Sequence, residues 1–468
     1  MSPKLFIGPK VRRLREARGW KLEACARQLG LSISYLSQIE ANQRPVTARV
    51  LISLMRAFEV DGSMLDADDD QRLMADLREA TADLPDAAAP LSLGEIKQVA
   101  TIAPAFARRY LDLHHAYRQL DERLKLTDET ISVDQAATAS GSLPYEEVRD
   151  FFHYKNNYIH DLDLAAEALA EDLGAGPLDE ARLEACLRER FDTVVVRDAA
   201  DDVMRRYDPM RRTLSVNASH PEATRIFQLA FHLAARTLGP LIEQELAVAP
   251  LHSAAAIDVC RVGLGNYAAG ALLMPYRRFA ADARALRHDV ERLSQRYNTS
   301  LEQVCHRLST LQRPGERGVP IYFVRVDYAG NITKRHSATR FQFARFGGTC
   351  PLWNVHEAIA QPDRFIVQIA EMPDGARYLC VARSLVKPSG SYLSPDRRYA
   401  IGIGCDLEHA GAMVYSQGVD LNAQPVKIGV SCRICERNDC QQRAFPPVDR
   451  RMSVPVDERR VVPFEVEG

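Results

Sequence analysis

Three cysteines near the end of the chain have a spacing that suits a metal centre. Cys432, Cys435 and Cys440 form a C-x2-C-x4-C pattern. Two thiols three residues apart can bind one metal in a tight loop, and a third thiol can close the same side. A structural zinc needs four N or S ligands and a [4Fe–4S] cluster usually needs four thiolates, so a fourth ligand is expected. Cys405 is the predicted fourth ligand, and His409 is an alternative that would fit zinc better.

The surroundings of these thiols allow a second interpretation. Nearby Arg433, Arg437 and Arg443 would lower the thiol pKa values and offset the thiolate charge. Without a metal, the three cysteines would be reduced thiols in a compact loop. We interpret Cys350 and Cys380 as packing residues. The N-terminus lacks a signal-peptide pattern and no apolar stretch approaches membrane-spanning length, so we expect a cytoplasmic protein without disulfides or a membrane partner.

The first sixty residues predict a basic, helical module. They contain eleven Lys and Arg against four Glu, whereas the whole chain has a net charge of −2. Gly30 is placed where a turn needs a positive φ, and Ser32 can cap the following helix. Apolar residues recur at helical spacing on both sides of this turn, at Leu22, Ala26, Leu29, Leu36 and Ile39. The pattern favours two short helices joined by a tight turn.

Residues 11–20 and 31–45 of this module resemble the phage-repressor-like helix-turn-helix family. The second helix of such modules lies in the major groove of DNA. The resemblance implies base-facing positions at Ser32, Ser34, Tyr35 and Gln38, of which Gln38 can bond adenine in a bidentate way. It places phosphate contacts around the groove edges, at Arg12, Arg13, Arg18, Lys21, Asn42 and Arg44. The alternative for each of these side chains is an ordinary charged surface.

The rest of the chain predicts a multidomain architecture. The all-α helix-turn-helix domain, residues 1–68, is followed by a helical connector at 69–150 that could mediate dimerisation. An α+β domain is expected at 151–315, and an α/β sensor domain at 316–468. A helix is expected at Glu222–Thr237. The predicted strands are 193–196, 213–216, 321–326, 365–369, 378–381 and 400–403.

Part of the middle domain resembles a metallopeptidase-like domain found in phage-immunity and stress-response regulators. The similar segments are 225–235 and 266–275. Active members carry His-Glu-x-x-His, in which two His hold zinc and the Glu takes a proton from the metal-bound water. Here these positions are Phe231, His232 and Ala235, so neither ligand position has a donor. We therefore expect a degenerate peptidase scaffold without hydrolysis, in which His232 is a structural histidine and the cleft is free to bind a ligand.

Taken together, these parts resemble one family over nearly the full chain, the short-chain fatty acyl-CoA responsive regulators. Residues 151–158 and 345–356 add to the likeness. The resemblance implies control of propionate, acetate or methylcitrate metabolism, an acyl-CoA or CoA effector and, in some members, an iron–sulfur cluster, which favours [4Fe–4S] over zinc. A CoA site needs cations, an aromatic face and an apolar slot. The residues predicted to supply them are Tyr158, Tyr267, Arg345, Trp353, His356 and Arg383.

The sequence thus predicts a regulator that binds a double-stranded DNA operator as a homodimer or higher oligomer and senses an acyl-CoA. Two alternatives belong to other classes. One is a redox-sensing regulator in which the cysteine-bound cluster sets DNA affinity. The other is a zinc peptidase that cleaves a partner, which would require ligands that Phe231 and Ala235 cannot provide.

Overall fold

The protein was analysed as a computed structural model that describes residues 7–41, 43–58, 68–82, 91–129, 144–198, 203–344, 348–389, 392–393, 395–447 and 450–466. The chain divides into two compact units. Unit 1 comprises residues 1–131 and 448–451, and unit 2 comprises residues 132–447 and 452–468. None of the described helices is both long and apolar enough to cross a membrane.

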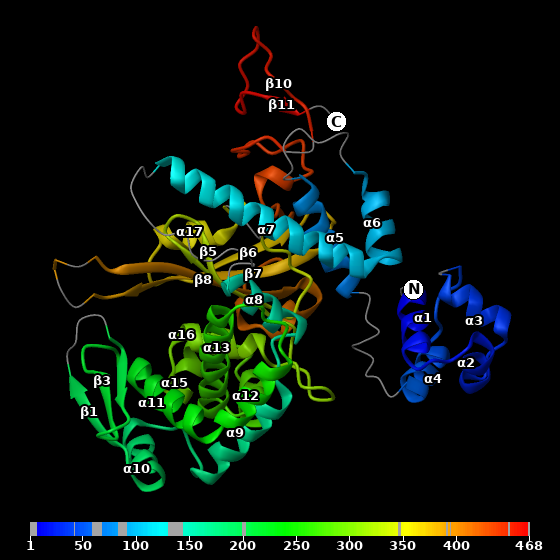
Figure 1. Ribbon diagram of the computed structural model, residues 1–468. Coiled ribbons are helices and arrows are strands. Elements are labelled where there is room, and N and C mark those ends of the chain that lie inside the picture. The colour runs from blue at the N-terminus through cyan, green and yellow to red at the C-terminus, as the bar shows by residue number, and fades with distance from the viewer. Residues whose placement is uncertain are drawn as a thin grey trace. The chain divides into compact units, whose positions relative to one another are not determined.

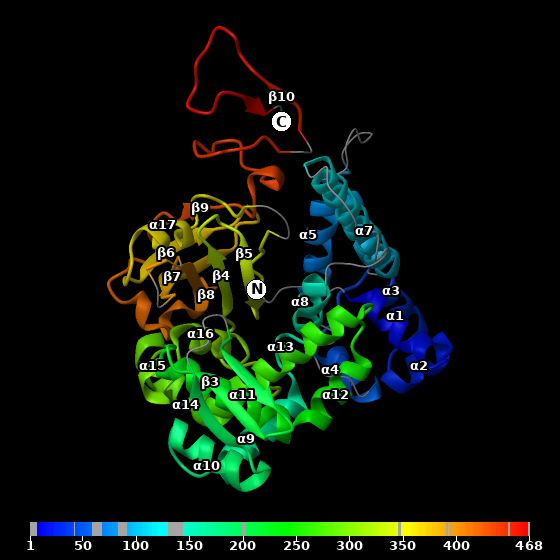
Figure 2. The same cartoon turned by 60° about the vertical axis from the view of Figure 1, so that its left-hand side comes forward.

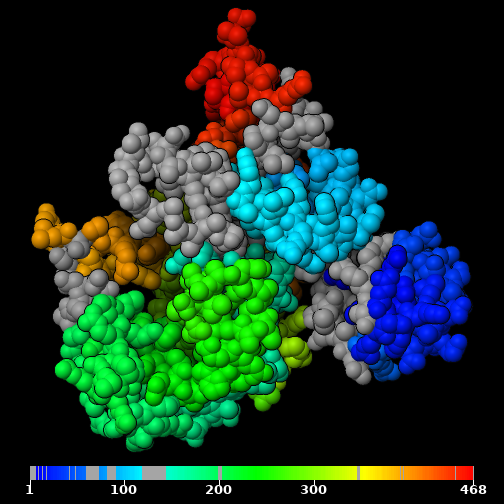
Figure 3. Space-filling view, viewed as in Figure 1, coloured from blue at the N-terminus to red at the C-terminus, as the bar shows by residue number. Residues whose placement is uncertain are grey.

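The start of unit 1 has the predicted helix-turn-helix arrangement. Its helices are α1 (Gly8–Ala17), α2 (Leu22–Leu29), α3 (Ile33–Glu40) and α4 (Ala48–Phe58). Gly30 ends α2 with a left-handed φ of 68°, and the Ser32 hydroxyl accepts a hydrogen bond from the Tyr35 amide to cap α3. Arg15 and Glu40 form a two-pronged ion pair, at 2.7 and 2.9 Å, which joins α1 to α3. Residues 7–58, blue in Figure 3, form a compact lobe around one apolar core.

The connector is helical, as predicted. It contains α5 (Asp68–Ala82), α6 (Leu93–Ile102) and α7 (Pro104–Glu129). A capping box between Ser92 and Glu95 starts α6, and Pro104 begins α7, where a missing amide hydrogen costs nothing. Leu73, Leu77 and neighbouring apolar residues form a small core between the three helices.

The predicted boundary between connector and middle domain, at 150/151, lies inside a helix and needs correction. Helix α8 (Pro144–Tyr154) runs through that position without a break. Val148, Phe151 and Phe152 of α8 are buried in the core of the middle domain. The helix therefore belongs to the middle domain, because its apolar face has its partners there.

The middle domain is α+β, as predicted, with helices packed beside a three-stranded sheet. Strand β3 (Thr213–Asn217) is central, parallel to β1 (Val194–Asp198) and antiparallel to β2 (Arg205–Asp208). Helix α11 (Glu222–Thr237) has the predicted bounds and packs on α13 (Ala254–Leu273), which lies among the other helices in Figure 1. The remaining helices are α9 (His160–Asp172), α10 (Glu180–Phe191), α12 (Gly239–Val248), α14 (Tyr276–Ala285), α15 (Val290–Tyr297) and α16 (Leu301–Ser309).

A six-stranded sheet in the order β5-β4-β8-β7-β6-β9 forms the C-terminal domain, antiparallel except for the β6–β9 pair. Its strands are β4 (Tyr322–Asp327), β5 (Ile332–Ser337), β6 (Ile366–Glu371), β7 (Arg377–Lys387), β8 (Arg397–Asp406) and β9 (Val426–Lys427). Side chains alternate between the faces: Leu379 and Val381 pack with α14–α16, whereas Tyr378 and Cys380 pack on the face that α17 (Asn354–Ala360) covers. Figure 2 shows α17 beside β6 and β7.

The segments after β8 are short. They comprise the 3-10 turns η2 (Leu407–Ala412), η3 (Val414–Ser416) and η4 (Cys432–Ile434), and the two-stranded pair β10 (Met452–Ser453) and β11 (Glu465–Val466). Turns η2 and η3 lie against α14 and α15, where the Arg287 guanidinium donates to the carbonyls of Gly411 and Met413. The middle and C-terminal domains therefore share one buried core within unit 2.

Candidate functional site

Helix α3 presents short polar side chains on the surface of the helix-turn-helix lobe. Ser32 and Ser34 are exposed, and Tyr35 and Gln38 are half-buried, because Leu36 and Ile39 point into the core. The exposed Arg44 guanidinium lies 5.8 Å from the centre of the Tyr35 ring. Ile33, 48% exposed, shares this surface and was missed by the sequence reasoning, although the inward spacing of Leu36 and Ile39 places residue 33 outside.

The predicted phosphate-contacting residues differ in their local roles. Lys21 is exposed directly before α2, and Arg12 forms an exposed ion pair with Glu16 at 2.8 Å. Arg18 donates to the Phe58 carbonyl at 2.8 Å, so it also joins the ends of α1 and α4. The side chain of Arg13 and the whole of Asn42 lie outside the described residues.

In unit 2, an arginine from strand β2 covers Phe231, the first ligand position of the metallopeptidase-like motif. The Arg205 guanidinium of β2 lies 3.5 Å from the centre of the Phe231 ring on α11 and donates to Gln228 Oε1 at 2.9 Å. Burial lowers the pKa of Arg205 to about 10, which leaves it charged at neutral pH. Gly265 of α13 makes room for the ring, since a Cβ there would lie 2.7 Å from it. This position therefore holds a cation–π pair instead of a metal-ligand pair.

His232, the residue at the general-base position, is packed as a neutral histidine. Its ring lies 4.5 Å from that of Tyr207. Burial, followed by the charges of Arg205 and Arg236, lowers the pKa of His232 to about 4. Its buried Nε2 has no hydrogen-bond partner among the residues that the structure describes. Ala235, at the second ligand position, is partly buried against the same core.

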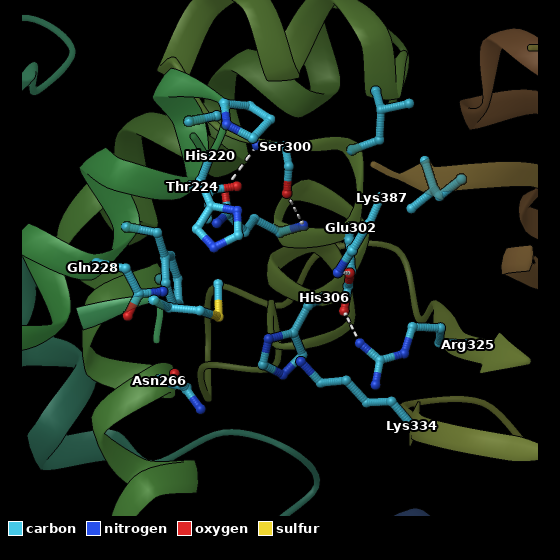
Figure 4. Close-up of a pocket in the computed structure, with 18 of the residues that line it drawn as sticks. His220, Thr224, Gln228, Asn266, Ser300, Glu302, His306, Arg325, Lys334 and Lys387 are labelled. Carbon is cyan, nitrogen blue, oxygen red and sulfur yellow. Dashed lines mark hydrogen bonds and ion pairs between the residues drawn. The ribbon is translucent and has the colours of Figure 1, made fainter. Parts of the chain in front are cut away.

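A cavity of about 510 Å³ lies between the middle and C-terminal domains of unit 2. Its walls come from the start of α11, from α13 and α16, and from strands β4, β5 and β7 (Figure 4). Phe227, Leu301 and Leu385 supply apolar surface. Asn266 and Tyr267 supply polar groups from α13. The cations of the lining are His220 when protonated, Arg307, Arg325, Lys334, Lys387 and Arg397.

Glu302 is the carboxylate in this lining, and it is already paired. Its oxygens lie 2.8 Å from Arg325 Nη1 and 2.6 Å from Lys387 Nζ. Although burial opposes ionisation, the charges of Lys334, Lys387 and Arg325 lower the pKa of Glu302 to about 2. Arg325 and Lys387 share the single negative charge of Glu302. Since Lys334 and Arg397 also line the cavity, the cavity carries an excess of positive charge. Such a surface favours an anionic ligand.

Beneath the cavity lies a buried ion-pair network. Asp163 of α9 is fully buried, and its carboxylate lies 2.5 Å from Arg307 Nη1 and 3.2 Å from Arg313 Nη2. The Tyr267 hydroxyl donates to the same carboxylate at 2.7 Å. Arg313 also pairs with Glu167, at 2.8 Å. Since Arg307 and Tyr267 both line the cavity, this network fixes its floor.

The structure brings one of the six predicted CoA-site residues, Tyr267, to this cavity. Trp353 is buried in the core beneath α17, and His356 bonds Thr349 there. Arg383 forms an ion pair with Glu291, away from the cavity. The Tyr158 hydroxyl accepts a bond from Arg313 Nε at 2.9 Å, and burial raises the pKa of Tyr158 to about 12. Arg345 lies outside the described residues.

The cysteine cluster has a different fourth member from the predicted one. Cys350, Cys432, Cys435 and Cys440 line one small pocket. Cys405 packs on the opposite face of the sheet, where its Sγ contacts Met413 Sδ at 3.5 Å. Burial raises the pKa of Cys405 to about 12. The structure therefore does not place Cys405 with the cluster. Cys350, which we interpreted from the sequence as a packing residue, lies beside the other three thiols instead.

Basic side chains hold the loop that carries these thiols. Arg443 donates to the carbonyls of Cys432 at 3.0 Å and Cys435 at 3.1 Å, and Arg437 also lines the pocket. Four thiols and adjacent cations form a donor set suited to a thiolate metal centre. Among the described residues, no three His, Cys, Asp or Glu side chains are close enough in their present positions to hold a metal ion. His409, the alternative ligand, pairs with Glu408 and does not line the pocket.

Three known families match separate parts of the chain. A helix-turn-helix domain family matches residues 7–67, the IrrE N-terminal-like domain family matches 188–309, and the family "short-chain fatty acyl coenzyme A regulator, C-terminal" matches 310–464. With the arrangement of α2 and α3, these matches define the class as helix-turn-helix regulators that carry a peptidase-like domain and a distinct C-terminal domain.

Full-length relatives specify the family. The chain is 48% identical to the propionyl-CoA carboxylase regulator of Cereibacter sphaeroides over 100% of both chains. It is 42% identical to the transcriptional regulators RamB (99% of both chains) and PrpR (98% of this chain and 95% of that one) of Mycobacterium tuberculosis. A solved structure of a Mycobacterium tuberculosis transcriptional regulator is 46% identical and matches 69% of this chain and 99% of its own, with a TM-score of 0.66. The chain belongs to the family of short-chain fatty acyl-CoA regulators, as its resemblance predicted.

Proposed function

We propose that this protein is a cytoplasmic transcriptional regulator, not an enzyme, whose affinity for operator DNA is set by a short-chain acyl-CoA bound in the cavity of unit 2. The observation that carries the proposal is the lining of this cavity, which combines unbalanced cations with an apolar strip and polar groups on α13. Phosphates of CoA would meet Lys387 and Arg397 at the β7–β8 end, and the acyl chain would meet Phe227 and Leu301. The names of its relatives support the same metabolic setting.

The absence of peptidase activity follows from the motif positions. Phe231 and Ala235 have no metal-binding atoms, and the Arg205 guanidinium covers Phe231. A fixed positive charge at this position would repel a zinc ion. The scaffold therefore retains a cleft-forming helix without a group that activates water. We expect no metal-dependent cleavage by the purified protein, and cleavage that disappears in His232→Ala would contradict this assignment.

The ligand assignment can be tested by calorimetry on the full-length protein. Propionyl-CoA should bind, and Arg397→Glu should weaken its binding about tenfold or more, because the variant reverses a charge expected to face the phosphates. Arg211→Glu is the matched control, since Arg211 is exposed on the turn before β3 and does not line the cavity. A wild-type protein that binds none of acetyl-, propionyl- or butyryl-CoA would exclude the proposal, as would equal losses in the two variants.

DNA binding by the helix-turn-helix lobe is expected to depend on two kinds of contact. Arg44→Ala should weaken binding to every sequence and flatten the salt dependence by about one unit, because one phosphate contact is lost. Gln38→Ala should cost roughly 1–3 kcal/mol on the operator and little on random DNA. Fluorescence anisotropy at several salt concentrations measures both effects. Equal losses on operator and random DNA for Gln38→Ala would remove the base-reading role.

The connector helices favour a dimer. Ile102, Phe106 and Leu113 of α6 and α7 are each more than two thirds exposed. A second copy of the same helices would bury them, and two helix-turn-helix lobes would supply the area that tight specific binding requires. Sedimentation at micromolar concentration should give a dimer, and Phe106→Asp together with Leu113→Asp should give a monomer. A wild-type monomer under these conditions would rule out this role for the connector.

A metal centre at the thiol pocket is a second proposal, carried by the shared pocket of Cys350, Cys432, Cys435 and Cys440. A [4Fe–4S] cluster is favoured over zinc because of the family resemblance, since four thiolates suit both. Either metal would crosslink the segment before α17 to the C-terminal loop. If the cluster alone altered DNA affinity, the protein would be a redox sensor. DNA binding compared between oxidised and reduced protein, with and without propionyl-CoA, separates the two modes.

A further inference from the structure

The amine of Lys334 has an unusual position in the cavity of unit 2. Lys334 lies on β5 and lines the cavity, but among the described residues its ammonium forms no hydrogen bond and no ion pair within 4.0 Å. The nearby carboxylate of Glu302 is already bonded by Arg325 and Lys387. The half-buried ammonium therefore lacks a counter-ion of its own, although a lysine that is partly removed from water usually has one.

The groups that face Lys334 weaken its hold on a proton. Burial is the largest cause, and the charges of Arg325 and Lys387 add to it against the opposing charge of Glu302, so that the pKa of Lys334 falls to about 8. Roughly one amine in ten is then uncharged at pH 7, compared with about one in three thousand for an ordinary lysine. An uncharged amine that faces a cavity is a nucleophile.

Two neutral histidines adjoin this amine. Figure 4 shows the Lys334 side chain ending beside the His306 ring. The rings of His306 and His336 lie 4.3 Å apart, and burial together with the charge of Lys334 holds the pKa of both well below the ordinary value. Because both imidazoles are neutral, they supply no negative charge that would hold the proton on the Lys334 amine.

We propose that Lys334 is a covalent modification site that takes the acyl group from a short-chain acyl thioester bound in the cavity. The Nζ–carbonyl carbon bond forms and the carbonyl carbon–sulfur bond breaks. The thiolate leaves with the bonding electron pair and takes up the proton that the amine releases. The products are an amide on Lys334 and a free thiol, so no oxidant or further reactant is needed. The inference rests on the proposed function, because the thioester must first bind in the cavity.

The modification would change the cavity in two ways. The amide carries no charge, so one cation of the lining is removed while Arg325 and Lys387 continue to hold Glu302. The transferred acyl group would also occupy space next to Phe323, whose ring lies 5.8 Å from the Lys334 Nζ. We therefore expect the acylated protein to bind CoA more weakly than the unmodified protein and to retain this state after the thioester has been removed.

The test uses the full-length protein and propionyl-CoA at pH 8. Intact mass should show one added propionyl group per chain, and peptide mapping should place it on Lys334. Lys334→Arg should remove this modification while keeping a positive charge. Lys155→Arg is the matched control, because Lys155 is 41% exposed, paired with Glu245 and outside the cavity. In wild-type protein at pH 7, Lys334 should react at least about tenfold faster than Lys155, given its larger fraction of free amine.

The outcomes separate this inference from the proposed function. A propionyl-CoA analogue with a thioether in place of the thioester should bind in calorimetry and leave the mass unchanged. The acylation rate at Lys334 should rise with pH and level off above about pH 8, whereas the rate at Lys155 should continue to rise. Binding of propionyl-CoA without modification of Lys334 overturns only the covalent step. A lack of binding overturns both, and equal modification of Lys334 and Lys155 shows non-specific acylation and also overturns the proposal.

Discussion

Replacing Asp163 with alanine should lower the free energy of unfolding of unit 2 by about 3–5 kcal/mol, the usual cost of removing one partner from a buried ion pair. The Asp163 side chain is 0% exposed and that of Arg307 is 3% exposed. Without Asp163, the guanidinium of Arg307 loses its carboxylate partner, and the Tyr267 hydroxyl loses its acceptor. Arg313 keeps Glu167 and is affected less. The melting temperature of the full-length protein should fall by roughly 5–15 °C on this basis.

A carboxylate on the same helix provides the control. Asp172, at the end of α9, pairs with Arg190 at 2.5 Å, but its side chain is 62% exposed. Asp172→Ala should change stability by no more than about 1 kcal/mol, because water replaces the lost partner. Calorimetric unfolding of both variants measures the difference. Similar losses of stability in the two variants would mean that burial does not strengthen the Asp163 network. Binding of acyl-CoA should weaken in Asp163→Ala and stay unchanged in Asp172→Ala.

Local sequence patterns predicted the elements whose residues interact mostly with near neighbours. The turn at Gly30, the cap at Ser32 and the bounds of α11 follow from helical spacing and capping chemistry, and the structure has all three. Strands β4, β6, β7 and β8 were predicted as apolar runs; the run for β4 has the observed length, and the other three are shorter than observed, by up to seven residues in β7. Their charged ends, such as Arg397 and Lys387, resemble loops in sequence because they pair only across the hairpin.

The cavity could not be predicted in the same way. Strand β5 was missed because its sequence, Ile-Thr-Lys-Arg-His-Ser, has little apolar character, and it is held at the edge of the sheet by β4. It supplies Lys334, which lines the cavity, and His336, whose ring lies 4.3 Å from that of the lining residue His306. One signal was available. Arg325 interrupts the apolar run of β4, and a charged residue inside such a run often marks a site.

The cysteine cluster was predicted in part for a similar reason. The spacing of Cys432, Cys435 and Cys440 is local and could be read directly, but the fourth thiol comes from a distant segment with no pattern of its own. Cys405 is nearer in sequence than Cys350. Strand alternation, however, directs Cys405 to the face of the sheet that packs with α14–α16, while the other thiols lie beyond the opposite face.

This geometry gives the last prediction, which concerns metal content. Protein purified without oxygen should contain about four iron atoms per chain and a broad visible absorption band if the proposed [4Fe–4S] cluster is present. Cys350→Ser and Cys432→Ser should each remove the metal and lower the melting temperature, because a thiolate ligand is lost and the two segments it joins are released. Cys405→Ser should keep the metal, since its Sγ faces Met413. Cys380→Ser is a second control from the core beneath α17.

Stoichiometric zinc without iron would retain the site and replace the cluster, whereas metal lost in Cys405→Ser but kept in Cys350→Ser would reverse the assignment of the fourth ligand. If neither metal is found in anaerobically prepared protein, the four cysteines are reduced thiols, and the loop is held by the hydrogen bonds that Arg443 and Arg437 donate to backbone carbonyls.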